Sequence, residues 1–349
     1  MNRREFLRKQ LILTTGILSG TALLKAAGFH SSQTAVQDTE GRIMTVRGPV
    51  APESLGIMLP HEHVFSQFGG GLVEDPEYGR EVLSGRVAPY LRYIQALGCT
   101  AVADCTAAYF GRAPELLQHL SEQTGLHLIT NTGYYGAAGD DYVPEHAYSE
   151  SVRDLAQRWI REWEQGIGQT GIRPGFMKIG VDPGPLSDID AKLIRAAAIT
   201  HLHTGLTIAV HTGGSPEAAM DELAILREEG VHPSAWIWVH AHNVQEVDAL
   251  SEAAGMGAWI EFDGLSADSL ERHLVLVKAM RERGHLDRVL LSHDGNSFPG
   301  RGQAPRHYDV LFTTFMDLLA SEGCSEQEIR QMTQENPGEA FTVGVREIS

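Results

Sequence analysis

Eight short apolar runs, separated by segments with helical spacing, constrain what this chain can fold into more than any other feature. Between the runs, apolar residues recur three and four positions apart, as in amphipathic helices. Runs that are apolar throughout need cover on both faces, so the alternation predicts a (β/α)8 TIM barrel with its active site at the C-terminal strand ends. The runs span 56–63, 100–106, 127–134, 175–182, 207–213, 236–242, 258–264 and 288–294.

The main competing architecture is a doubly wound open sheet. That fold would need a phosphate-binding G-x-G-x-x-G turn after an early strand, and the sequence contains none. A length of 349 residues fits one large domain, and we assign 41–349 to the barrel. Within it we expect a short strand in 41–50 before the barrel proper. We also expect a helix pair in 325–349, broken at Asn336-Pro337.

The first 28 residues have the character of a bacterial export signal. Arg3 and Arg4 precede an apolar run over 11–24, which is followed by Lys25 and small residues. The run is shorter than the roughly 20 residues of a membrane span, so we interpret 1–28 as a twin-arginine export signal and 29–40 as a linker. The alternative is a basic N-terminal helix of a cytosolic protein. The signal would make the twin-arginine export machinery a partner and place the protein in the periplasm or outside the cell.

Charge and cysteine content exclude several functional classes. The formal net charge of −17 argues against nucleic acid and anionic membranes as partners. The three Cys residues form no CxxC pair, so a structural zinc site built from thiolates is not indicated. The charge is otherwise uninformative; a small-molecule substrate is expected from the candidate site, and a homodimer is compatible with the sequence.

Six candidate metal ligands lie at the ends of five of the eight runs. In a (β/α)8 barrel these ends meet at one face, so residues far apart in sequence can share a site. The two His of the first run are two positions apart on a strand, so their side chains point to the same side. Each residue alone is more often structural, but the joint pattern strongly favours a metal site. The candidates are His61, His63, Lys178, His211, His240 and Asp294.

The residue types suggest which metal chemistry the site performs. A Lys inside an apolar strand is costly unless it is paired, neutral or modified, although Lys178 could also reach solvent at the strand rim. A carboxylated Lys178 would supply an anionic bridge between two divalent ions. Asp294 could be both ligand and general base, or simply a turn or helix-capping residue. Nitrogen and oxygen ligands without thiolate suit Zn2+, and also Mn2+ or Co2+.

Several multi-residue markers, in order along 41–341, resemble the phosphotriesterase family of the amidohydrolase superfamily. They include His61-Glu62-His63, the Lys178 strand, Val239-His240 and the segment 287–294 ending in Asp294. The resemblance implies that His61, His63 and Asp294 hold a buried metal, and that His211 and His240 hold a more exposed one. Carboxylated Lys178 (N6-carboxylysine) and a hydroxide would bridge the two ions. The hydroxide would attack a phosphorus or carbonyl centre, and Asp294 would receive the proton.

Two positions depart from the specialised members of that family. Asn243 and Gly264 stand where phosphotriesterases have the Asp and His of a proton relay, and Gly264 also replaces an Arg typical of lactonases. Neither activity therefore follows from the resemblance. His242 either supports the metal ligands from outside the ligand set or is a histidine at the rim of the barrel with no such role.

Substrate contacts are less constrained by the sequence than the ligands. The candidates are Tyr134, Tyr135, His242 and Asp263, with one of the two tyrosines expected to line the pocket and the other to pack. We also expect the loop 296–308, with Phe298, Arg301 and Arg306, to influence specificity.

The function that fits these features best is a binuclear metal-dependent hydrolase of esters, lactones or phosphotriesters. One alternative is a mononuclear, deaminase-like member of the same superfamily, although such an enzyme has no need of a bridging Lys178. The other is an exported, inactive homologue that binds a metal or ligand.

Overall fold

The computed structural model describes residues 39–74, 76–300 and 302–348, and it confirms the predicted (β/α)8 barrel. All neighbouring barrel strands pair in parallel. The barrel strands are β3 (Ile57–His63), β4 (Cys99–Asp104), β5 (His127–Ile129) with β6 (Asn131–Thr132), β7 (Phe176–Gly180), β8 (Ile208–His211), β9 (Trp236–Val239), β10 (Trp259–Phe262), and β11 (Val289–Leu291) with β12 (Gly295–Asn296).

The third and eighth barrel strands are each interrupted, and the interruptions join two sheets. Thr130 separates β5, which pairs with β4, from β6, which pairs with β7. Residues 292–294 separate β11, which pairs with β10, from β12, which pairs with β3. The strand order therefore returns to its starting point through both sheets.

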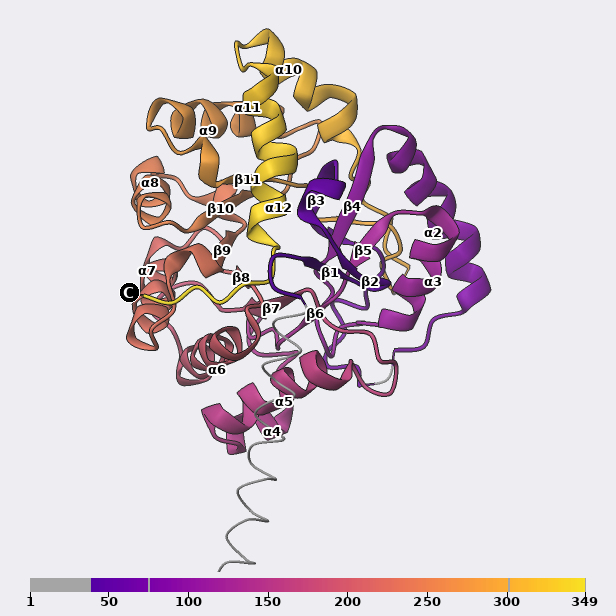
Figure 1. The fold of residues 1–349 in the computed structure, drawn as a ribbon, viewed down its shortest axis with the longest axis vertical. Coiled ribbons are helices and arrows are strands. Elements are labelled where there is room, and N and C mark those ends of the chain that lie inside the picture. Colours follow the sequence, from indigo (N-terminus) through magenta and orange to yellow (C-terminus); the bar gives the residue numbers. More distant parts are fainter. Residues whose placement is uncertain (1–38, 75, 301, 349) are drawn as a thin grey trace, which may run out of the picture. The chain divides into compact units, whose positions relative to one another are not determined.

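Helices surround the strands in Figure 1, and their buried apolar faces form one large core cluster with the outer faces of the strands. Local sequence sets their ends; Ser151 and Asp154, for example, form a capping box at the start of one helix. The helices are α2 (Arg80–Ala96), α3 (Pro114–Thr124), α4 (Glu145–Ser149), α5 (Val152–Gln165), α6 (Asp188–Thr204), α7 (Pro216–Glu228), α8 (Val247–Gly255), α9 (Leu270–Glu282), α10 (Met316–Ser321), α11 (Glu326–Arg330) and α12 (Asn336–Ala340).

The N-terminal end of the barrel is closed by the first and last described segments of the domain. The segment expected to hold one short strand forms an antiparallel hairpin instead, β1 (Ile43–Thr45) with β2 (Gly48–Val50). Phe341, just after α12, packs its ring 5.2 Å from that of Phe176 inside the barrel. Both rings belong to an inner cluster of buried apolar side chains. Function is thereby restricted to the opposite, C-terminal end.

The C-terminal segment also differs from the predicted broken helix pair. A π-helical turn, Gln331–Glu335, connects α11 to α12, and the backbone stays in the right-handed helical region at Asn336. The Asn336 side chain donates hydrogen bonds to the carbonyls of Leu286 (2.8 Å) and Val289 (2.7 Å). Pro337 is tolerated because it stands in the first turn of α12, where a helix needs no N–H donor.

A register shift in β3 decides which side chains enter the barrel. Met58 belongs to the inner core cluster and Leu59 to the outer one. Strict alternation would then turn Glu62 inward, but the pairing with β4 shifts between Leu59 and Glu62. The shift turns His61 and His63 into the barrel and Glu62 outward, toward residues 292–295.

The predicted export signal over 1–28 lies outside the described residues, as does the linker up to residue 38. Gly41–Ser349 forms one compact unit. Within the part of the chain that the structure describes, no helix has both the length and the apolar character needed to cross a bilayer.

Candidate active site

A cavity of about 180 Å³ lies at the C-terminal ends of the barrel strands. The structure brings all six predicted ligands to its wall, although they come from five different strand ends. Three aromatic side chains and the loop after β12 complete the lining. The six are His61, His63, Lys178, His211, His240 and Asp294.

One group within the cavity has the spacing of a metal site. Nε2 of His63 lies 3.2 Å from Oδ1 of Asp294, and Nε2 of His61 lies 3.6 Å from the same oxygen. Donor atoms of the three residues all lie within 4.8 Å of one another, so one ion could take all three. Asp294 has a φ of 51° and His240 a φ of 63°, a left-handed conformation that is uncommon outside Gly. Such backbone conformations cluster at functional sites.

Lys178 carries a buried amine at the centre of this ligand set. The residue is 1% exposed, and Nζ has no hydrogen-bond partner among the described residues. An unpaired ammonium in a buried site is strongly disfavoured. The position therefore suits an amine that is covalently modified or that faces an anionic group.

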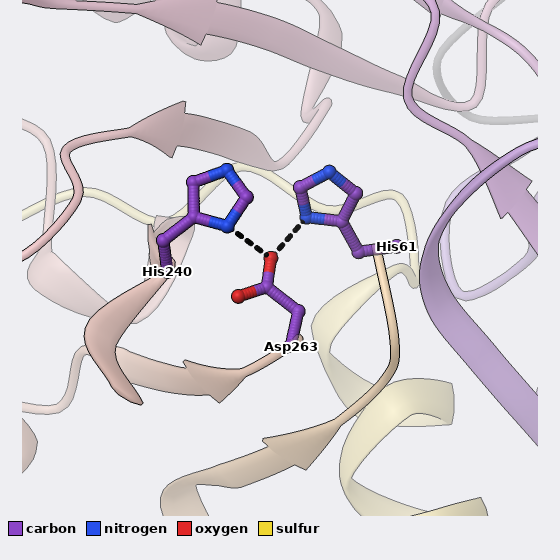
Figure 2. A group of neighbouring side chains, drawn as sticks. All are labelled: His61, His240 and Asp263. Carbon is purple, nitrogen blue, oxygen red and sulfur yellow. Dashed lines mark ion pairs between the residues drawn. The ribbon is translucent and has the colours of Figure 1, made fainter. Parts of the chain in front are cut away.

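Asp263 holds two of the histidines from behind (Figure 2). Its Oδ2 makes ion-pair contacts with Nδ1 of His61 at 2.5 Å and with Nδ1 of His240 at 2.9 Å. Two atoms that share a tetrahedral Zn2+ would lie roughly 3.3 Å apart, so the shorter spacings leave no room for an ion between them. A carboxylate that holds one ring nitrogen leaves the other free for a metal, an arrangement typical of metal-binding His.

Asp263 therefore occupies a different place from the substrate contact that we predicted. It is 0% exposed and does not line the cavity, whereas the two rings that it contacts do. Burial alone would raise the pKa of this carboxyl, but His240 and His61 hold it well below its usual range. Asp263 is accordingly ionised, and it contacts the candidate ligands without lining the cavity.

Glu261 is a functional candidate that our sequence reasoning missed. It lies in β10, two positions before Asp263, which directly follows the strand, and its Oε2 lies 3.2 Å from Nδ1 of His61. Burial raises the pKa of Glu261 above its ordinary value. The available signal was a carboxylate inside the otherwise apolar run Trp-Ile-Glu-Phe.

His63 is oriented by a separate contact. Its Nδ1 lies 2.8 Å from the hydroxyl of Thr106, which itself donates to the carbonyl of Phe65 at 2.8 Å. The hydroxyl proton is committed to Phe65, so Nδ1 of His63 carries the proton and donates, leaving Nε2 bare toward Asp294. Burial lowers the pKa of His63 to about 4. The ring is therefore neutral, the form that metal binding requires.

The two predicted tyrosines separate as expected, one toward the cavity and one into packing. Tyr135 lines the cavity, and its hydroxyl lies 3.0 Å from Nδ1 of His211. Burial, with His240 and Lys178 nearby, lowers the pKa of His211 well below its ordinary value.

Tyr134 faces away from the candidate ligands. Its hydroxyl lies 3.0 Å from Nε2 of His146, and its ring packs edge-on against Trp159. It lines a separate small cavity beside Arg112 and Glu162. The structure therefore does not place Tyr134 at the cavity as a substrate contact.

His242 also acts through Asp263 and does not line the cavity. Its Nδ1 donates to Oδ1 of Asp263 at 3.0 Å, and its ring stacks on His273 with centroids 5.3 Å apart. A Cβ at Gly264 would lie 2.6 Å from Nε2 of His242, so the ring occupies space that only Gly leaves open. Asn243 is exposed on the 3-10 turn Ala241–Asn243.

Asp294 is also held by the loop that follows it. Nη2 of Arg306 donates to the backbone carbonyl of Asp294 at 2.7 Å and to its Oδ2 at 3.4 Å. Burial alone would raise the pKa of Asp294, but the close contact with His63 and the charge of His61 hold it below its usual range. The carboxylate is therefore ionised and available as a ligand or base.

Comparison with known proteins agrees with this geometry. The model of the phosphotriesterase family matches residues 41–341. The phosphotriesterase homology protein of Escherichia coli is 30% identical over 82% of this chain and 98% of its own. The N-acetyltaurine hydrolase of Rattus norvegicus is 25% identical over 86% of this chain and 98% of its own. The organophosphorus hydrolase from Deinococcus radiodurans superimposes with a TM-score of 0.79 at 27% identity, covering 87% of this chain and 97% of that one. This chain belongs to the phosphotriesterase family of metal-dependent hydrolases.

Proposed function

We propose that this protein is a binuclear hydrolase that cleaves an ester, lactone or phosphotriester. The observation that carries the proposal is the amine of Lys178, which is buried among four histidines and Asp294 and has no hydrogen-bond partner in the described part of the chain. Carboxylation of this amine would convert an unfavourable buried cation into an anionic bridge. A mononuclear site would leave the position of Lys178 unexplained.

The donor set fits two divalent ions. One ion would be held by His61, His63 and Asp294, and the other by His211 and His240. Carboxylated Lys178 would bind both ions. The ions, Zn2+ with Mn2+ or Co2+ as alternatives, would compensate anionic charge, polarise the scissile bond and activate water near neutral pH.

The chain's own residues complete the proposed chemistry. Asp294, ionised and at the cavity wall, would accept the proton of the attacking water. Asp263 and Thr106 would fix the ring orientations of three ligands, so that little reorganisation accompanies the reaction. The walls formed by Phe68, Phe110 and Tyr135 would exclude solvent from the bond being cleaved.

Amide hydrolysis is a second candidate. The family includes a relative named N-acetyltaurine hydrolase, while the structural neighbour is named for organophosphorus compounds. The same ligand set could serve either reaction, because both place developing negative charge on an oxygen. The leaving group, and not the metal site, would distinguish them.

The test is hydrolysis by protein prepared with Zn2+, Mn2+ or Co2+. A panel of aryl esters, lactones, phosphotriesters and N-acyl amides should reveal at least one class whose turnover disappears on chelation and returns with metal. Turnover that survives complete metal removal, or the absence of turnover on every class, would contradict the proposal.

Export through the twin-arginine machinery is a separate proposal from the sequence of residues 1–28. Fractionation of cells that produce the full chain tests it. Replacing Arg3 and Arg4 with Lys should retain the protein inside the cell, whereas unchanged export would contradict the assignment.

A further inference from the structure

The cavity wall combines an apolar aromatic surface with one permanent cation. Phe68, Phe110 and Tyr135 contribute the aromatic side chains. Among the described lining residues, Arg306 and Lys178 are the only Arg or Lys side chains, and Lys178 belongs to the candidate ligand set. The chain as a whole has a net charge of −17, so a cation at this position is not a consequence of a basic surface.

Backbone hydrogen bonds to Asn296 hold Arg306 in place. Its N–H donates to the carbonyl of Asn296 at 2.9 Å, and its carbonyl accepts from the N–H of Asn296 at 2.7 Å. This bridge ties residue 306 to the strand end that directly follows Asp294. The hydrogen bond from Nη2 to the Asp294 carbonyl then fixes the guanidinium beside the site.

Several N–H donors of the Arg306 guanidinium have no partner among the described residues. Both of its side-chain bonds come from Nη2, and neither Nε nor Nη1 has a partner among the described residues. A guanidinium presents five donors in a planar fork that matches a carboxylate or a phosphate. The Arg306 side chain is more than half exposed, so these donors remain accessible from the solvent side.

The cavity is also small. Its volume of about 180 Å³ is below the roughly 300–1,000 Å³ of sites for drug-sized ligands. A ligand that fills it can reach from the candidate metal ligands to Arg306 with a short apolar segment. A neutral phosphotriester would make no charge-assisted hydrogen bond to Arg306, whereas an anionic substrate could.

We infer that Arg306 forms an anion subsite, and that the substrate is a small acid whose scissile bond and anionic end are separated by a short apolar segment. The anion is a carboxylate or another oxyanion of similar shape. This inference rests on the proposed hydrolase function, because it places the scissile bond at the candidate metal ligands.

The kinetic test uses matched substrate pairs. 4-Nitrophenyl esters whose acyl chain ends in a carboxylate are each compared with the methyl ester of that carboxylate, at several chain lengths. Wild-type protein should prefer the acid at one chain length. In Arg306→Gln the ratio of kcat/KM for acid over methyl ester should fall by about tenfold, equivalent to roughly 1.4 kcal/mol, mainly through KM.

Controls separate the anion subsite from general damage. The ratio is the readout because Arg306 also holds Asp294, so the substitution can lower both rates together. Arg306→Lys should keep part of the preference, since it retains charge but loses the fork. Arg283→Gln removes a guanidinium paired with Asp248 on the outer surface, and should leave the ratio unchanged.

A binding measurement distinguishes failure of the inference from failure of the hydrolase proposal. Calorimetry compares glutarate with butyrate, which can contact the candidate metal ligands but has no second carboxylate for Arg306. Tighter binding of glutarate that disappears in Arg306→Gln supports the subsite even if no ester is cleaved. Ester cleavage with no preference for acids, or a preference that survives in Arg306→Gln, overturns the inference and leaves the hydrolase intact. Absence of both cleavage and selective glutarate binding contradicts both.

Discussion

The ring of His242 occupies the space into which a side chain at Gly264 would extend. A Cβ at position 264 would lie 2.6 Å from Nε2 of His242, and the same ring donates from Nδ1 to Asp263. The two positions are therefore coupled. Gly264 permits a histidine from the end of β9 to support the carboxylate at the end of β10, which in turn contacts His61 and His240.

Gly264→Ala should displace the His242 ring and weaken metal binding. The backbone at 264 has a φ of +95°, so Ala would also add strain of about 1–2 kcal/mol. Gly323→Ala is the matched control, because its φ is +90° and a Cβ there would meet nothing within 4 Å. Both variants should lose stability in thermal unfolding, and only Gly264→Ala should lose metal affinity in a chelator competition. Equal metal affinities in the two variants would show that the contact has no influence on the site.

Removing the His242 ring should have a similar effect without backbone strain. His242→Ala deletes the donor to Asp263 and is expected to reduce metal affinity by about 10–100-fold, as for other groups that orient metal ligands. His242→Asn should restore part of the loss, because its amide nitrogen can occupy the place of Nδ1. Metal titration of the three proteins measures this order. Asn behaving no better than Ala would argue that the ring acts by packing on His273 alone.

Glu62 should stabilise the closure of the barrel between its first and last strands. It is fully buried, and Oε1 accepts from Ser292 Oγ (2.9 Å) and His293 Nδ1 (2.7 Å). Its Oε2 accepts from the backbone N–H of Gly295 at 2.7 Å. Glu62→Gln replaces one acceptor with a donor that faces other donors, so we expect a loss of about 2–4 kcal/mol. Thermal or urea unfolding measures it against the exposed Glu53→Gln, and a loss no larger than in that control would refute the role.

Glu222 should make stability depend on pH independently of the metal site. Burial raises the pKa of Glu222 from 4.5 to about 8, and its Oε2 accepts from Trp236 Nε1 at 2.8 Å. Between these values the folded protein keeps a proton that the unfolded chain releases, so this group's contribution to stability falls as pH rises from about 4.5 to about 8. Glu222→Gln should remove that slope, whereas the exposed Glu217→Gln should retain it. Parallel stability profiles for wild type and Glu222→Gln would contradict the assignment.

Lys178→Ala should lose most bound metal and activity. Short carboxylic acids such as acetate should restore part of both, because a free carboxylate can replace the missing bridge in the space that the side chain vacates. Lys278→Ala, which removes an exposed amine paired with Glu322, is the matched control. Retention of full metal content in Lys178→Ala would exclude a bridging role.

The fold could be predicted from the sequence because its evidence is repeated along the chain. Eight apolar runs and intervening helical spacing specify a barrel even where one strand is ambiguous. The breaks at Thr130 and at 292–294 could not be predicted, because they depend on pairing with neighbours on either side. The π-helical turn before Asn336 likewise depends on tertiary hydrogen bonds that no local pattern reveals.

The candidate ligands were accessible to sequence reasoning, and His242 was one open alternative for a residue that supports them, but Asp263 was assigned another role and Glu261 was missed. The spacing of His61 and His63 indicates a ligand pair, yet their inward orientation depends on a register shift in β3. Asp263 follows a strand as a substrate contact would, and only the structure shows that His61 and His240 line the cavity while Asp263 contacts their Nδ1 atoms. Depth along a strand end is set by packing, which a one-dimensional pattern does not record.

The number of metal ions per chain tests the central claim most directly. Protein purified without added chelator and analysed by elemental mass spectrometry should contain about two divalent ions per chain, and Lys178→Ala clearly fewer. Two ions would agree with a bridged pair held by His61, His63, His211, His240 and Asp294. One ion that Lys178→Ala retains would indicate a mononuclear enzyme, and no bound ion after incubation with Zn2+, Mn2+ or Co2+ would contradict the account.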